Sequence, residues 1–178
     1  MGSSGETYVR EMAIDPAARA GETVRARQHR LLAALRPKVA LFAELRLDWA
    51  AHEAAWDALT RFCTGPVRAH LCAADQALYA PASVGAQTRL LVAALRASRA
   101  QLGGRIETLV RTDEAEAAAR LAYGIEALLA AHLAVEHDVL LPALAALPGV
   151  DLPALVAHFA TLLDQGGPVA RRTVLAAA

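Results

Sequence analysis

Aromatic residues and cysteines are scarce in this chain. Only 4% of its 178 residues are Phe, Trp or Tyr and only two are cysteine, although 56% are hydrophobic. The hydrophobic excess consists of alanine and leucine, which favour helices, whereas isoleucine, threonine and aromatic residues are too few for a β-rich protein. A chain of 178 residues can bury a core without disulfides. The composition therefore predicts a single all-α domain.

An excess of charge of either sign is absent as well. The 18 basic residues balance the 18 acidic ones, and no basic stripe stands out, so we expect no nucleic-acid partner. The first residues lack a cationic segment followed by an apolar one, and no stretch of about 18 or more residues is free of charge. We therefore expect neither a signal peptide nor a membrane span.

The two cysteines, Cys63 and Cys72, are nine residues apart on one expected helix. Nine residues rise about 13 Å and end half a turn out of phase, whereas a disulfide needs Cα atoms within about 7 Å of each other. We expect two free thiols, which agrees with a cytoplasmic protein.

Apolar spacing, prolines and glycines divide the chain into five expected helices. They run from Gly21 to about Leu45, from about Trp49 to Pro81, from near Ser83 to about Leu109, from 114 to 147, and from Leu152 to Leu163. Gly65-Pro66 predicts a bend in the second helix, and Asp113 is the expected N-cap of the fourth. Because the long helices have short connections, we predict an antiparallel four-helix bundle with a short extra C-terminal helix. Residues 1–20 would form an N-terminal arm, 21–165 the bundle and 166–178 a tail.

The fourth helix carries the most informative pair of polar residues. His132 and Glu136 are four residues apart, so they share a helix face with several leucines and valines. A carboxylate on an apolar face is costly unless it is paired or binds a metal. An imidazole nitrogen and a carboxylate oxygen can both bind one ion. We favour a metal-ligand role for His132 and Glu136 over the alternative, in which they lie at a helix end in contact with water.

The second helix has a similar arrangement around His70. Ala74 stands four residues after His70 and Asp75 five residues after it, which places Asp75 about 140° away round the helix. Tyr79 follows; it could donate a hydrogen bond into the bundle, but we favour packing in the core or at its rim.

These segments resemble the hemerythrin-like (HHE cation-binding) proteins. The resemblance covers about residues 22–163 and rests on Arg27-Gln28-His29-Arg30-Leu31-Leu32, on Phe62-Cys63 through His70 to Leu78-Tyr79, on His132-x-x-x-Glu136 with Leu140-Leu141-Pro142-Ala143-Leu144, and on Pro148-Gly149-Val150-Asp151-Leu152. It implies a four-helix bundle that holds a pair of metal ions between histidines and carboxylates.

Carried over position by position, the resemblance implies that the metal ligands are His29, His70, His132 and Glu136. Two family ligands are replaced, a bridging glutamate by Ala74 and a third-helix histidine by Ser98. The remaining set suits one ion better than two irons. Iron, mononuclear or di-iron, is the expected cofactor, with zinc or haem as alternatives. Asp75 and His137 lie beside ligand positions and are further candidates.

Three functions are consistent with these residues. The first is a metal-binding protein whose open coordination position meets oxygen, peroxide, nitric oxide or a small substrate. The second is an enzyme that uses the space vacated at Ala74 and Ser98 for an organic substrate or haem. The third is a metal-free bundle with a structural or partner-binding role. We favour the first; the sequence does not decide whether the protein is an enzyme, and it leaves a homodimer open.

Overall fold

The computed structural model describes residues 15–44 and 49–166, and every regular element within these ranges is helical. The elements are α1 (Pro16–Glu44), α2 (Trp49–Phe62), η1 (Cys63–Val67), α3 (Arg68–Ala74), η2 (Asp75–Tyr79), α4 (Ala80–Ala82), α5 (Arg89–Arg111), α6 (Ala115–Val135), η3 (Glu136–Leu140), α7 (Leu141–Ala145) and α8 (Leu152–Gly166). The η elements are π-helices, whose wider turn takes up one extra residue. The all-α prediction is confirmed.

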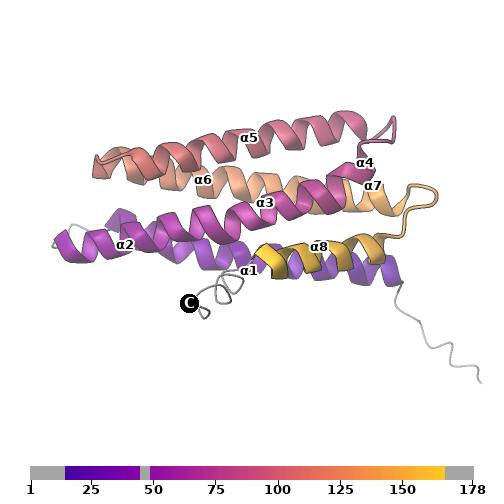
Figure 1. Cartoon of the computed structure of the whole chain (residues 1–178), viewed down its shortest axis with the longest axis horizontal. Helices are drawn as coiled ribbons and strands as arrows, with labels where there is room; N and C mark the ends of the chain where they lie inside the picture. The colour runs from indigo at the N-terminus through magenta and orange to yellow at the C-terminus, as the bar shows by residue number, and fades with distance from the viewer. Residues whose placement is uncertain (1–14, 45–48, 167–178) are drawn as a thin grey trace, which may run out of the picture.

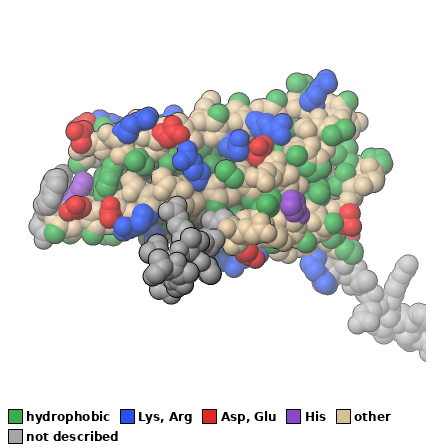
Figure 2. Space-filling view, in the orientation of Figure 1, with side chains coloured by type: hydrophobic (Ala, Val, Ile, Leu, Met, Phe, Trp, Pro, Cys, Tyr) green, Lys and Arg blue, Asp and Glu red, His purple; other side chains and the backbone are tan. Residues whose placement is uncertain are grey.

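Consecutive elements join into five helical rods within the described residues. One rod runs without a break from α2 to α4, and another runs from α6 to α7. These two lie side by side with α1, α5 and α8 along the long axis of the molecule (Figure 1). The shorter α8 packs against α1, α3 and η2. Basic and acidic side chains are interspersed over the face shown in Figure 2.

Several helix ends differ from those expected. α1 begins at Pro16 rather than Gly21, because Asp15 Oδ1 accepts a hydrogen bond from the Ala17 amide at 3.0 Å and proline suits the first helical position. The end of the expected N-terminal arm is therefore helical; residues 1–14 and 167–178 lie outside the described part. α5 begins at Arg89 rather than Ser83, since the buried Thr88 hydroxyl donates to Ala82 O in the preceding turn.

The fourth rod also begins and ends slightly inside its predicted bounds. Glu114, in an extended conformation, is the N-cap residue of α6 in place of Asp113. The rod ends at Ala145, and Gly149 then takes a positive φ of 77° in the turn to α8. That backbone conformation favours glycine, which agrees with the predicted stop at Pro148-Gly149.

The π-helices occur beside prolines. Gly65-Pro66, where the sequence predicts a bend, lies inside η1, and Pro81 and Pro142 each come two residues after a π-helix ends. A proline has no N–H, so the carbonyl four residues before it loses its α-helical donor. The rods continue through these points with a widened turn instead of breaking.

Buried hydrophobic side chains form two separate clusters along the long axis. The first includes Val24, Ala74, Leu78, Tyr79, Leu95, Leu140 and Phe159. The second includes Leu35, Leu59, Cys63, Leu71, Leu102, Leu129 and Leu133. Cys63 and Cys72 are both free, as predicted, with Cys63 buried and Cys72 exposed.

One segment of the described chain, Ala115–Ala145, has the length and apolar composition of a membrane-crossing helix. Of its most apolar window, 39% is buried inside the structure, and a helix in the core of a soluble protein would meet the same two conditions. Its apolar face contributes to both core clusters.

Candidate functional site

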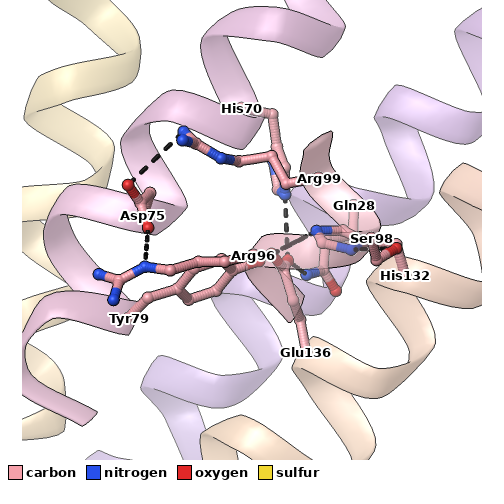
Figure 3. Close-up of polar contacts among 9 residues, drawn as sticks. All are labelled: Gln28, His70, Asp75, Tyr79, Arg96, Ser98, Arg99, His132 and Glu136. Atoms are coloured by element: carbon pink, nitrogen blue, oxygen red, sulfur yellow. Dashed lines mark hydrogen bonds and ion pairs between the residues drawn. The ribbon is translucent and has the colours of Figure 1, made fainter. Parts of the chain in front are cut away.

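A layer of polar side chains separates the two hydrophobic clusters. On three rods Gln28, Ser98 and Glu136 each lie between members of one cluster and members of the other, and on the α2–α4 rod His70 lies near the end of the second cluster and Tyr79 within the first. We call this set the polar layer; it comprises Gln28, His70, Tyr79, Ser98, His132 and Glu136, and Figure 3 shows it. All except Ser98 are buried. The layer thus brings α1, α3–η2, α5 and α6–η3 to one point.

Glu136 is at the centre of the layer and is completely buried. Its Oε2 accepts a hydrogen bond from Gln28 Nε2 at 2.8 Å and lies 3.2 Å from His70 Nε2. Its Oε1 accepts a hydrogen bond from the Tyr79 hydroxyl and lies 3.3 Å from His132 Nε2. Each carboxylate oxygen therefore has one imidazole and one other donor.

These contacts keep the carboxyl group ionised. Burial alone would raise the pKa of Glu136, but its hydrogen bonds and electrostatic interactions with His132 and His70 outweigh burial and hold it well below its usual range. Burial and the neighbouring Glu136 carboxylate in turn raise the pKa of Tyr79 far above its usual value, so the phenol keeps its proton beside the carboxylate.

The position of Tyr79 depends on η2. Tyr79 comes nine residues after His70, and nine residues of regular α-helix would turn it about 180° away from His70. The extra residue taken up by the π-turn reduces the rotation to about that of eight residues, which leaves the two side chains about 80° apart. The prediction that Tyr79 packs in the core is confirmed, since Tyr79 is completely buried in the first hydrophobic cluster, and its hydroxyl also makes polar contacts there. Pro81, which follows η2, could have indicated the widened turn, because a proline deprives the carbonyl four residues before it of its α-helical donor.

His132 is held from both of its ring nitrogens. Its Nε2 lies 3.0 Å from Tyr79 Oη, and its Nδ1 lies 3.0 Å from Ser98 Oγ on α5. Ser98, where the family resemblance implies a histidine, therefore contacts a predicted ligand and orients its ring.

The structure does not place His29 in the layer. His29 is exposed, and the neighbouring Gln28 is buried at 2% exposure and bonds to Glu136. One residue is about 100° of helix rotation, so only one of the two can face the interior. Of the four predicted ligands, His70, His132 and Glu136 come together, and His29 is replaced by an amide.

The two additional candidates lie outside the layer. Asp75 is half-buried and pairs with Arg96 Nε at 2.8 Å and Arg99 Nη1 at 3.6 Å on α5. His137 Nδ1 lies 3.3 Å from the Asp138 carboxylate. Ala74 is completely buried in the first hydrophobic cluster, so no carboxylate from α3 replaces the missing bridge.

α8 covers the layer from one side. The ring of Phe159 packs edge-on against His70, with 5.3 Å between ring centroids, and Phe159 itself is completely buried. The fifth rod therefore excludes water from the imidazole that approaches Glu136 Oε2.

The donor set can be tested for its fit to a metal. Among the described residues, no group of three or more His, Cys, Asp and Glu side chains could hold an ion. The two histidines approach opposite oxygens of one carboxylate, as they would around a carboxylate that bridges two ions. Two imidazoles and one carboxylate are nevertheless too few donors for two irons, which prefer about six ligands each. Two edges of a triangle that includes a tyrosine match one ion: His132 Nε2 lies 3.0 Å from Tyr79 Oη and 3.3 Å from Glu136 Oε1. Along the third edge the Tyr79 hydroxyl donates a hydrogen bond to Glu136 Oε1, so an ion would have to displace that proton and move the two oxygens apart. Adjacent donors on a single ion, each about 2.1 Å from it, are about 3 Å apart.

A pocket of about 330 Å³ lies elsewhere, near the start of α2 and the turn between α5 and α6. Its lining includes His52, Trp56, Arg111 and Ala118, but neither Ala74 nor Ser98. Ala118 and His132 are fourteen residues apart on α6, or about 21 Å along its axis. This pocket is therefore separate from the polar layer, where the sequence suggested space for an organic substrate or haem.

Comparison with known proteins adds no identity to this geometry. No family model, no curated protein and no solved structure matches the chain.

Proposed function

We propose that the polar layer binds a single metal ion, with iron favoured over zinc, through His132, Glu136 and Tyr79, whose phenol proton the ion would displace. The observation that carries this proposal is a completely buried carboxylate in contact with a phenol and two imidazoles from separate rods. In this proposal the four rods that meet at the layer form an antiparallel four-helix bundle of the hemerythrin-like kind, and α8 is the extra helix.

The residues around the triangle support a ligand role. Metal-bound histidines usually have a hydrogen-bonding partner at their second nitrogen, and Ser98 Oγ is in that position for His132 at 3.0 Å. His70 and Gln28 fix the other oxygen of Glu136. Tyr79 belongs to η2 and Glu136 to η3, and π-turns inside helices are common at functional sites.

The ligand set determines which chemistry is available. A single iron held by three side chains would supply open coordination positions for oxygen, peroxide, nitric oxide or another small ligand. The protein would hold that ligand among buried side chains, since α8 covers His70 and the hydrophobic clusters lie on either side.

Elemental analysis together with an absorption spectrum tests this proposal. We expect protein purified without chelator to contain about one metal ion per chain, and His132→Ala and Glu136→Gln to lose it. His29→Ala is the matched control: that histidine is exposed, so the variant should keep the ion. Zinc would give a colourless protein because it has a filled d shell. Wild-type protein with less than about half an equivalent of any transition metal would contradict the proposal.

A second function is favoured by a specific observation. The members of the polar layer already satisfy one another, since Glu136 accepts from Gln28 and Tyr79 and both imidazoles approach it. Tyr79 also keeps its proton, because burial and Glu136 raise its pKa. Such a network can fix helix packing without any metal.

The two functions differ in their response to chelators. If the layer binds a metal, a chelator should lower the melting temperature, because the ion stabilises only the folded chain. In a metal-free network the chelator has no effect, while His132→Ala still destabilises the fold because it leaves a buried charge with fewer partners. The melting temperatures of wild type and His132→Ala, each measured with and without chelator, separate the metal-binding function from the metal-free one.

A further inference from the structure

The solvent-facing side of α6 and η3 is unusual for a surface helix. The exposed positions between Arg120 and Asp138 are Tyr123, Ala127, Ala131, Ala134 and Val135, none of them charged. Tyr123 is 51% exposed, Val135 37% and, just beyond Asp138, Val139 48%. We call this set, from Arg120 to Val139, the outer face of α6. Surface helices normally carry charged residues on this side, as α5 does with Arg89, Arg96 and Arg105.

We propose that the outer face of α6 binds the same face of a second copy of the chain, in an antiparallel helix pair around a two-fold axis. In such a pair the same patch is used on both copies, and each residue meets a partner at an equal distance from the axis. The axis would pass midway between Ala127 and Ala131.

The sequence of the outer face is self-complementary about that point. Ala127 lies opposite Ala131 of the second copy, so the two helices can approach closely. Tyr123 lies opposite Val135, an aromatic ring against a branched side chain. The three pairs are two, six and nine residues from the centre, and the last places Arg120 opposite Asp138.

Charge complementarity selects a second copy as the occupant. Arg120 and Asp138 stand at opposite ends of the stretch whose exposed positions carry no charge, about 27 Å apart along the helix. Within the chain Arg120 pairs with Glu116 and Asp138 with His137, yet their side chains remain 63% and 61% exposed. An antiparallel pair brings them together twice, once at each end. A parallel pair would instead place like charges together. A membrane surface has no separate sites of opposite charge to match a cation at one end of the face and an anion at the other.

Sedimentation velocity on the purified full chain tests the proposal. We expect wild type to dimerise at micromolar concentrations, and Ala131→Glu to shift it to monomer by placing charges at the centre of the pair. Ala93→Glu is the matched control: Ala93 is exposed on α5, and this variant should dimerise like wild type. Circular dichroism should show unchanged helix content in both variants, because both positions are exposed.

A charge exchange tests the register of the pair. Arg120→Asp alone and Asp138→Arg alone should each weaken the dimer at least about tenfold, because each creates like-charge pairs. The double variant restores opposite charges and should recover an affinity within about threefold of wild type. Wild type that remains monomeric at about 200 µM, or that sediments with phosphatidylcholine vesicles as a monomer, overturns the proposal. So does a dimer that Ala131→Glu leaves intact.

Discussion

At the scale of single residues, Glu136 explains why this interior tolerates a charge. A buried carboxylate is costly unless all of its lone pairs find donors. Gln28, His70, Tyr79 and His132 surround its two oxygens, and their contacts come from three rods. Because the donors are distributed over separate helices, the charge is stabilised only when those helices pack together.

The Tyr79 hydroxyl gives a direct measure of this stabilisation. Tyr79→Phe removes one donor to Glu136 and leaves the ring in place, so we expect a loss of about 1–3 kcal/mol in the free energy of unfolding. Tyr123→Phe removes a hydroxyl from an exposed ring and should change stability by less than about 0.5 kcal/mol. Urea denaturation of both variants makes the comparison; equal effects would show that the buried hydrogen bond contributes nothing.

The exchange of His29 for Gln28 shows what sequence reasoning could have found. Val24, Gln28, Leu35 and Val39 recur at the spacing of one buried helix face. His29 lies on the same helix face as Arg25 and Arg36, which indicates that this face is half-exposed. The resemblance to the hemerythrin-like proteins favoured the histidine, whereas the hydrophobic spacing of the same helix favours the glutamine, and the structure follows the spacing.

At the scale of helical elements, α8 protects the polar layer as well as extending the core. Phe159 is completely buried and lies against His70, so the last rod links the hydrophobic core to the polar contacts. The predicted start of this helix at Leu152 is confirmed. The helix begins there because Asp151 Oδ1 accepts a hydrogen bond from the Ala154 amide at 3.0 Å and so caps its N-terminus.

Truncating the Phe159 ring should therefore be costly. We expect Phe159→Ala to lower the free energy of unfolding by about 3–5 kcal/mol, from lost burial and the cavity that remains. His158→Ala changes the exposed neighbouring residue and should remain within about 0.5 kcal/mol of wild type. Thermal and urea unfolding report the difference, and a small effect of Phe159→Ala would mean that α8 is not integral to the fold.

The π-turn in η2 makes a second prediction at this scale. Deleting the exposed Gln76 should convert η2 to regular α-helix, with Tyr79 still on the face of His70, because the π-turn already contains one residue in excess. Deleting the exposed Ala94 from α5 instead rotates all later residues of that helix by about 100°. Circular dichroism and melting curves should show a folded protein for the first deletion and an unfolded or strongly destabilised one for the second.

The π-turns also limit what could be predicted from the sequence. A rotation of 100° per residue places Asp75 and Tyr79 correctly only when the helix is regular, and η2 begins at Asp75. Asp75, with no extra residue before it, points away from His70 as calculated and pairs with Arg96. Tyr79 comes after the extra residue of the π-turn, so its side chain lies nearer the face of His70 than a regular α-helix would place it.

At the scale of the whole molecule, the choice of basic residues affects behaviour in alkali. Only one of the 18 basic residues, Lys38, is a lysine, and arginine keeps its charge far above neutral pH. The surface ion pairs between arginine and carboxylates therefore persist at pH values where lysine pairs would be lost. Buried acids that are neutral in the folded state should dominate the response.

We expect stability to fall as the pH rises above about 9. Burial raises the pKa of Cys63 from 9.0 to about 11, and the pKa of Tyr79 is raised as well. A raised folded-state pKa adds stability that is complete below the unfolded-state value and lost as the pH rises through the folded-state value. Urea unfolding from pH 7 to 11 should show this decline, and the difference between wild type and Tyr79→Phe should shrink above about pH 10.

The polar layer between two hydrophobic clusters also fixes how the rods can be aligned. If one helix slid along its neighbours by a single turn, about 5.4 Å, the Glu136 charge would face leucines above or below and lose its donors. A buried charge without its partner costs about 3–5 kcal/mol, whereas an apolar side chain moved by one turn still finds apolar neighbours. A chain this rich in alanine and leucine has several alignments of its helices in which apolar residues still meet apolar residues. The single buried carboxylate allows only one of these helix registers.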